Sequence, residues 1–183
     1  EISIKYLLVE LISGISFVFI FLNYNNYLEI AFLQVLVIIF LIIFFIDLKH
    51  FIIPDSLNFS LIILAISKNF IPNFESNFTY DLNQSIVGGI LGYFVIWIII
   101  FLYKKIKNLD AMGLGDAKLM AGIGLLFGWK SIPFVLFVSA IIGLISVIPS
   151  LINKTKNLRT EIPFGPYIIV STIIYYFCGN LIL

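Results

Sequence analysis

Charged residues are scarce in this sequence, and so are cysteine and histidine. Only 11% of the 183 residues are charged, whereas 61% are hydrophobic; soluble domains carry roughly 25% charged residues. The single cysteine, Cys178, excludes an intrachain disulfide and a thiolate zinc site. The net charge of +1 indicates no attraction to nucleic acid. The composition therefore predicts an integral membrane protein, and no ligand cluster indicates a metal.

Long apolar runs occupy most of the chain. A helix needs about 20 apolar residues to cross the hydrocarbon, and we place such segments at about residues 4–22, 30–47, 56–71, 84–103, 116–128, 131–151 and 163–182. The runs lack period-2 alternation, and an open sheet cannot satisfy its backbone in lipid. We therefore expect an all-α fold, a polytopic transmembrane bundle of about seven membrane segments. It would form one integral-membrane domain over residues 1–183.

Glycines recur in two of these segments. The fourth holds Gly88, Gly89 and Gly92, and the fifth holds Gly122 and Gly124. Small residues let membrane helices approach closely. Helix packing therefore explains these glycines without a role in a functional site.

The cations of the chain are unevenly distributed between the loops. Loops rich in Lys and Arg stay in the cytoplasm. Of the 11 cations, only Lys68 and Lys130 fall on one side, and the loops of the other side contain the rest: Lys5, Lys49, Lys104, Lys105, Lys107, Lys118, Lys154, Lys156 and Arg159. This asymmetry predicts that the second set of loops is cytoplasmic.

Two aspartates stand at the ends of apolar segments. Asp47 ends the second segment and Asp116 begins the fifth, which places both on the cytoplasmic face. An acid at a bilayer centre costs about 2.5 to 3.5 kcal/mol on insertion scales, so an acid within such a segment suggests a function. The two together suggest an acid/base pair.

The residues around each aspartate differ in what they indicate. Gly113 and Gly115 precede Asp116; glycine permits positive φ and lacks bulk, so another backbone could approach the carboxylate. The alternative is that Asp116 is a plain N-cap. Asp55 follows a proline and can cap the next helix. Asp47 follows a helix, at the unfavourable end of its dipole, so a structural role explains it less well.

At this point the sequence resembles a known family. The segments DLKHFIIPDSLN (47–58) and GLGDAKLMAGIGLLFGW (113–129) resemble the two signature blocks of type IV prepilin leader peptidases, which are membrane aspartic proteases with a GxGD motif. YLLVEL (6–11) and IPFGP (162–166) also resemble segments of that family. The resemblance covers nearly the whole chain. It implies an aspartic endopeptidase of the bacterial inner membrane that removes the leader of prepilins or pseudopilins, for type IV pili or protein secretion, at the cytoplasmic face.

The resemblance also implies roles for residues. Asp47 and Asp116 map to the catalytic pair, in which one carboxylate is the general base on a water and the other, protonated, polarises the scissile carbonyl. We expect supporting roles for Asp55, Gly113, Gly115, Pro163 and Gly165. The peptidase reaction would need no cofactor.

One part of the family pattern is absent. Bacterial members usually carry an upstream domain with two CxxC pairs and methylate the new N-terminus with S-adenosylmethionine. Neither pair is present here. We interpret this as truncation, with a naturally short peptidase as the alternative, and expect N-methylation only from a longer full-length chain.

Three rival functions are open to a chain with two such aspartates. Proteases of the presenilin kind pair a Tyr-Asp with a Pro-Ala-Leu motif, whereas Ile46 precedes Asp47 here and the late segment contains PFGP. A proton- or cation-coupled transporter could also use two intramembrane acids, but it would place them near mid-bilayer and accessible from both sides. A noncatalytic scaffold is the third rival.

Overall fold

Helices account for nearly all of the residues that the structure describes. The computed structural model describes residues 4–71, 74, 81–107, 112–152 and 162–182. These residues form seven α-helices and one 3₁₀ turn, with no strand among them: α1 (Ile4–Asn23), α2 (Tyr27–His50), α3 (Asp55–Ser67), η1 (Lys68–Phe70), α4 (Leu82–Lys107), α5 (Leu114–Phe127), α6 (Ser131–Ile152) and α7 (Gly165–Ile182). The predicted all-α bundle is confirmed.

Four helices are long and apolar enough to cross a membrane. They are α1, α2, α4 and α6, whose spans have a mean hydropathy of 2.0, 2.9, 2.5 and 2.5. The third and fifth segments, which are short in the sequence, form helices α3 and α5 of 13 and 14 residues. The chain is an integral membrane protein in which short helices are packed among longer ones.

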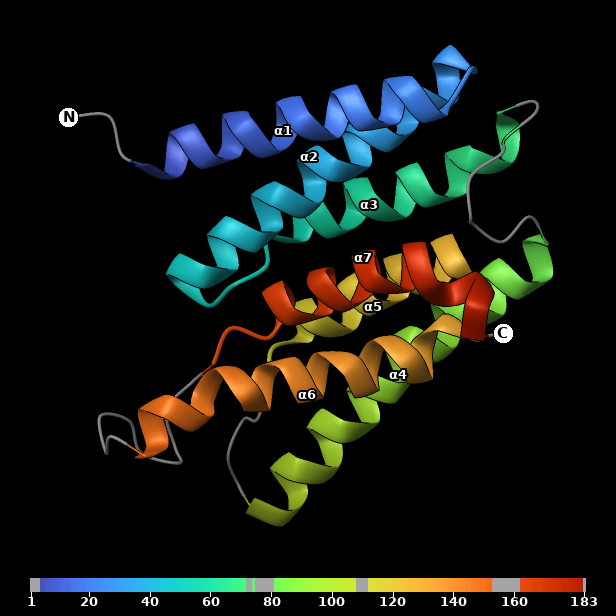
Figure 1. The fold of residues 1–183 in the computed structure, drawn as a ribbon. Helices are drawn as coiled ribbons and strands as arrows, with labels where there is room; N and C mark the ends of the chain where they lie inside the picture. The colour runs from blue at the N-terminus through green and yellow to red at the C-terminus, as the bar shows by residue number, and fades with distance from the viewer. Residues whose placement is uncertain (1–3, 72–73, 75–80, 108–111, 153–161, 183) are drawn as a thin grey trace.

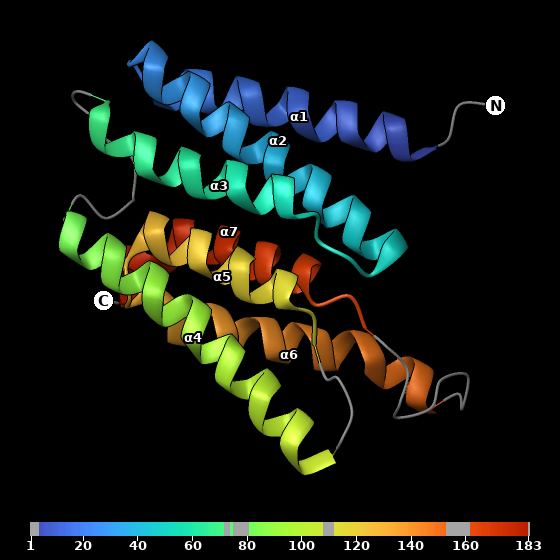
Figure 2. The ribbon, with the colours of Figure 1, turned by 180° about the vertical axis from the view of Figure 1, so that it is seen from behind.

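Helix α5 lies at the centre of the bundle. It packs against α3, α4, α6 and α7, whereas α1 packs chiefly on α2 at the edge (Figures 1 and 2). Most of the α5 side chains are buried, among them Leu119, Met120 and Ile123. Because α5 begins at Leu114, this arrangement places the start of a central helix, and Asp116 with it, against the helices around it.

The contact between α4 and α5 depends on the glycines for which the sequence predicts a packing role. Gly88 and Gly124 face one another so closely that a Cβ on either would overlap the carbonyl of the other. A Cβ on Gly92 would lie 2.5 Å from the Met120 carbonyl oxygen. Backbone atoms cannot move aside as a flexible side chain can, so only glycine permits this distance between the helices.

Gly124→Ala is therefore expected to destabilise the bundle by about 1 to 3 kcal/mol through overpacking. The matched control is Gly14→Ala on α1, where an added Cβ meets nothing within 4 Å. That control should be neutral or stabilising by up to about 1 kcal/mol, because alanine restricts the unfolded chain. Thermal unfolding in detergent, followed by circular dichroism, measures both. Equal melting temperatures for the two variants would contradict the glycine-dependent packing.

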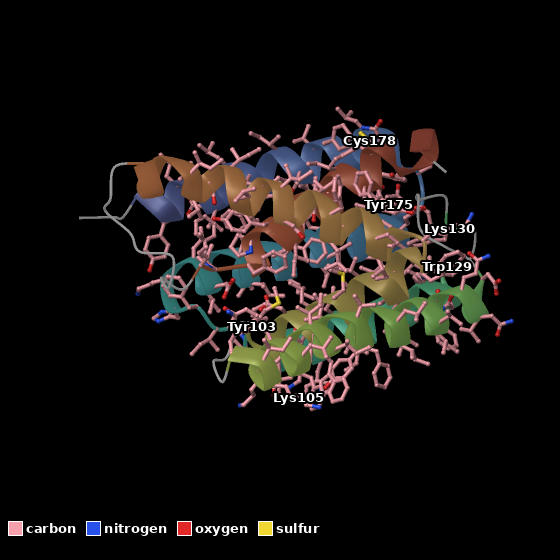
Figure 3. The ribbon with its side chains drawn as sticks, turned by 90° about the horizontal axis from the view of Figure 1, so that it is seen from below. Tyr103, Lys105, Trp129, Lys130, Tyr175 and Cys178 are labelled. Carbon is pink, nitrogen blue, oxygen red and sulfur yellow. The ribbon has the colours of Figure 1, made fainter. Side chains whose placement is uncertain are left out.

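The described cations gather at opposite ends of the bundle. Lys105 lies at one end with Tyr103, whereas Lys130 lies at the other with Trp129 (Figure 3). Lys68 is at the second end too, but it is only 4% exposed, and its Nζ donates to the carbonyls of Leu125 and Leu126, each at 2.7 Å. Lys68 therefore caps the C-terminus of α5.

Part of the predicted charge pattern lies outside the described residues. Lys154, Lys156 and Arg159 belong to this part, as does the side chain of Lys5. The described cations still divide between the two ends as the sequence predicts.

Candidate functional site

The two aspartates lie at the same end of the bundle. Asp47 is in the last turn of α2 and Asp116 is the third residue of α5; both helix ends lie at the left in Figure 1. Both side chains are buried, with 4% and 8% of their surface exposed. Gly165, which lies against Asp47, and Gly115, which precedes Asp116, both lie against the same side chain, that of Ile53. The structure therefore brings together two acids that are far apart in the sequence.

A third helix supports Asp47. The backbone N–H of Gly165, the first residue of α7, donates to Asp47 Oδ2 at 2.9 Å. The first N–H groups of a helix have no partner within the helix, and its dipole is positive there. The start of α7 therefore compensates for the position of Asp47 at the negative end of α2, which a local interpretation of the sequence could not explain.

Asp116 lies in the first turn of α5. Gly113 is the N-cap of α5, so the alternative of Asp116 as a plain N-cap is wrong. Asp116 is instead the third residue of the helix, and its backbone N–H donates to the Gly113 carbonyl at 3.2 Å. Gly113 has φ −77°, so this turn does not use the positive φ that glycine permits.

Ile53 packs against both glycines next to the aspartates, Gly115 and Gly165. A Cβ on Gly115 would lie 3.0 Å from Ile53 Cβ, and a Cβ on Gly165 would lie 3.0 Å from Ile53 Cδ1. The buried Ile53 side chain thus packs against the glycine before Asp116 and against the glycine that donates to Asp47. A side chain at position 115 would therefore force Ile53 to move by a few tenths of an ångström. Sequence reasoning missed Ile53, because nothing local distinguishes it from its apolar neighbours.

The turn before Ile53 has an unusual backbone. Phe51 ends α2 in the left-handed region, with φ 56° and ψ 32°, and its N–H donates to the Asp47 carbonyl at 2.9 Å. Among the described residues it is the one non-glycine with positive φ, and bulky residues rarely adopt this conformation. The chain thereby turns sharply after Asp47 and brings Ile53 back to the site.

Asp55 and Pro163 have lesser places in the site. Pro54 is the N-cap of α3 and Asp55 is its first residue, so the expectation that Asp55 caps the helix is wrong. Asp55 is exposed and pairs with Lys118 Nζ at 2.6 Å, which links α3 to α5. Pro163 is part of the non-helical stretch before Gly165, and no described contact joins it to either aspartate.

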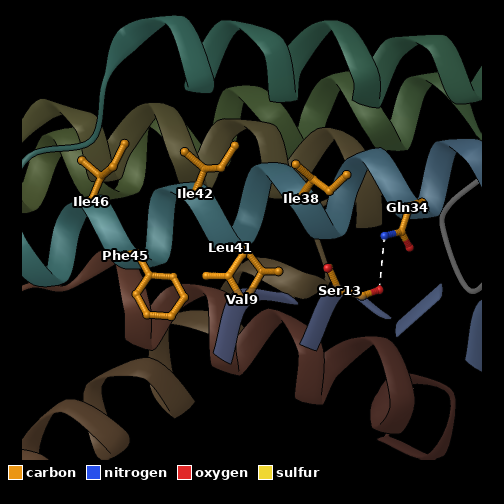
Figure 4. Close-up of a pocket in the computed structure, with 8 residues that line it drawn as sticks. All are labelled: Val9, Ser13, Gln34, Ile38, Leu41, Ile42, Phe45 and Ile46. Atoms are coloured by element: carbon orange, nitrogen blue, oxygen red, sulfur yellow. Dashed lines mark hydrogen bonds between the residues drawn. The ribbon is translucent and has the colours of Figure 1, made fainter. Parts of the chain in front are cut away.

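A cavity lies beside this site but does not contain it. It is a half-open pocket of about 380 Å³ between α1 and α2, lined by Val9, Ser13, Gln34, Ile38, Leu41, Ile42, Phe45 and Ile46 (Figure 4). Neither aspartate is among these residues, because Asp47 is on another side of α2. Within the described residues, no group of three or more His, Cys, Asp or Glu side chains could hold a metal.

Comparison with known proteins finds relatives of this chain along most of its length. Residues 34–148 match the model of the type IV leader peptidase family, a range that contains both aspartates. The chain is also similar to proteins named prepilin leader peptidase/N-methyltransferase. The relative from Aeromonas hydrophila is 29% identical over 170 residues (93% of this chain and 57% of the relative), that from Dichelobacter nodosus 31% over 170 (93% and 56%), and that from Legionella pneumophila 29% over 181 (99% and 61%).

The match covers only part of each relative's length. The chain spans less than two thirds of each of these relatives. No solved structure matches it. The family match covers more than half of the chain and includes Asp47, Asp116 and the segments around them. The chain belongs to the type IV leader peptidase family.

Proposed function

We propose that this chain is a membrane-embedded aspartic endopeptidase that removes the leader peptide from prepilins or pseudopilins. The observation that carries the proposal is the pair of buried carboxyl groups, Asp47 and Asp116, at one end of a helical bundle. Family membership supports a peptidase, and the names of the relatives supply the substrate class.

Two neighbouring acids are sufficient for peptide hydrolysis. One carboxylate takes a proton from a water molecule, whose oxygen attacks the scissile carbonyl carbon, while the other carboxyl, protonated, donates a hydrogen bond to the carbonyl oxygen. The carbon–nitrogen bond then breaks, and the amine leaves with a proton from the pair. Because the two groups interact, they titrate as a unit.

We place the reaction at the cytoplasmic face of the bacterial inner membrane. Lys49 is in the last turn of α2, Lys118 is near the start of α5, and Lys104, Lys105 and Lys107 are in the last turn of α4. Gly88 meets Gly124 and Gly92 meets Met120, so α4 runs antiparallel to α5 and ends beside its start. Such clusters favour the cytoplasmic side. They also attract the anionic lipids of that leaflet, so the lipid bilayer itself is a partner of this surface.

The second activity in the relatives' names, N-methylation, is assigned no residue of this chain. The chain matches 57% of the Aeromonas hydrophila relative. If the full-length protein methylates the new N-terminus with S-adenosylmethionine, we expect segments outside this sequence to bind that cofactor.

The transporter alternative has less support. It requires acids near mid-bilayer that both sides can reach. Asp47 lies in the last turn of α2 and Asp116 in the first turn of α5, at one end of the bundle. This placement and the family match both favour the peptidase.

The proposal is tested by cleavage of a prepilin reporter in membranes that contain this chain. We expect a shorter product whose mass and N-terminal sequence locate one scissile bond after the leader. Inside-out vesicles, which expose the cytoplasmic face, should cleave an added reporter, whereas right-side-out vesicles should not. Release of the same product by membranes without the chain, or no product at all, would contradict the peptidase assignment.

A further inference from the structure

Helix α3 presents one polar residue to an otherwise apolar contact with α5. Its buried residues are Asn58, Leu61 and Ala65, which recur on one face of the helix. Leu61 packs against α5, where a Cβ on Gly122 would lie 2.7 Å from it. Asn58 is 1% exposed, so it occupies a position where an apolar residue would serve the packing equally well.

The amide of Asn58 reaches the turn before Asp116. Its Nδ2 donates to the Gly115 carbonyl oxygen at 3.2 Å. That carbonyl belongs to the peptide unit whose N–H is Asp116 N, and this N–H donates to the Gly113 carbonyl at 3.2 Å. The peptide unit that carries Asp116 is therefore held at both ends.

The other atom of the amide indicates that packing alone does not explain Asn58. Asn58 Oδ1 is buried and has no hydrogen-bond partner among the described residues. An unpaired buried acceptor is unfavourable, so a residue selected only for stability would lack it. The amide contributes a donor at the Gly115 carbonyl, and that donor is its distinguishing contact.

We propose that Asn58 is a positioning residue for Asp116, which orients the Asp116 carboxyl toward Asp47 by fixing the Gly115–Asp116 peptide from α3. The consequence for catalysis rests on the proposed peptidase function. The geometric part, that Asn58 sets the surroundings of the Asp116 carboxyl, does not. The two parts therefore have separate measurements.

The first measurement is steady-state cleavage of a prepilin reporter by Asn58→Leu, which removes the donor and keeps a branched side chain. A displacement of about 1 Å costs roughly 10²-fold in rate, so we expect kcat to fall by about 10- to 100-fold with KM within about twofold. The matched control is Gln34→Leu. Gln34 is another amide that donates to a backbone carbonyl, that of Ser13 at 3.4 Å, and its Oε1 is also unpartnered. The control should cleave at the wild-type rate.

The second measurement needs no substrate. Dicyclohexylcarbodiimide modifies protonated carboxyl groups in apolar surroundings, and mass spectrometry of the digested chain quantifies the modification of Asp116 at each pH. We expect the pH profile of this modification to shift in Asn58→Leu and to stay unchanged in Gln34→Leu. If the wild-type chain does not cleave the reporter, the proposed function fails and this profile decides the role of Asn58 alone.

A second variant, Asn58→Asp, keeps the proposal testable if Asn58→Leu does not fold. Asn58→Asp keeps the shape of the side chain, but its carboxyl can donate to the Gly115 carbonyl only when protonated. We expect the ratio of its kcat to that of the wild type to rise as the pH falls. A wild-type rate for Asn58→Leu, an unshifted Asp116 profile, or a pH-independent ratio for Asn58→Asp would each overturn the proposal.

Discussion

Replacing Asp47 or Asp116 by asparagine is expected to reduce cleavage of a prepilin reporter by about 10²- to 10⁴-fold, the usual contribution of a general acid or base. The amide keeps the size and shape of the carboxyl group but cannot ionise. Both side chains are buried at one end of the bundle. The loss should appear in kcat, measured in membranes with matched amounts of protein.

The matched control is Asp55→Asn at the same end of the bundle. Asp55 is exposed, and its described partner is Lys118 rather than either buried acid. An exposed ion pair contributes about 0 to 1 kcal/mol to stability, so this variant should fold normally and retain most activity. Wild-type cleavage by Asp47→Asn or Asp116→Asn, or equal losses in all three variants, would contradict the assignment of the pair.

Gly165→Ala is expected to lower cleavage by about 10²-fold, because a small displacement of a reacting group has an effect of that size. The added Cβ would lie 2.8 Å from Asp47 Oδ2 and 3.0 Å from Ile53 Cδ1. The Asp47 carboxyl ends a side chain that can rotate away, so we expect the bundle to stay folded while Asp47 loses the Gly165 N–H. Cleavage kinetics and thermal unfolding of the same preparation separate these two effects.

Gly179→Ala is the control in the same helix. Its added Cβ meets the ring of Tyr175 at 3.2 Å and is far along α7 from the start that supports Asp47. This variant should cleave at nearly the wild-type rate. If Gly165→Ala is as active as Gly179→Ala, the bond from Gly165 to Asp47 has no part in the reaction.

Much of the fold follows from local features of the sequence. The apolar runs predict the helices, and even the two short runs form helices as expected, α3 and α5. The glycines predict close helix packing, and the structure shows that the helices that meet at them are α4 and α5. The extent of a single membrane domain over residues 1–183 stays a prediction.

The site was predictable only in part. Acids at the ends of apolar segments are costly, so Asp47 and Asp116 stand out, and their catalytic roles stay a prediction. Ile53 and Asn58 do not stand out, because their significance depends on contacts with Gly115 across a gap of more than fifty positions. The role of Gly165 was expected only in general terms, since its N–H meets Asp47 from a different helix.

The expected cap at Asp55 failed for a local reason. Pro54, in an extended conformation, takes the N-cap position and its carbonyl accepts from Leu57 and Asn58, so the helix begins one residue earlier than a capping aspartate requires. The free carboxyl of Asp55 then pairs with Lys118.

The most direct test of the account is a double-mutant cycle on leader cleavage with Asp47→Asn, Asp116→Asn and the combined variant. Groups that act as one unit lose their function together, so their effects are strongly non-additive. The account predicts that the combined variant is no slower than the slower single variant. Losses that multiply in the combined variant would show that the two carboxyl groups act independently, and would contradict the paired mechanism.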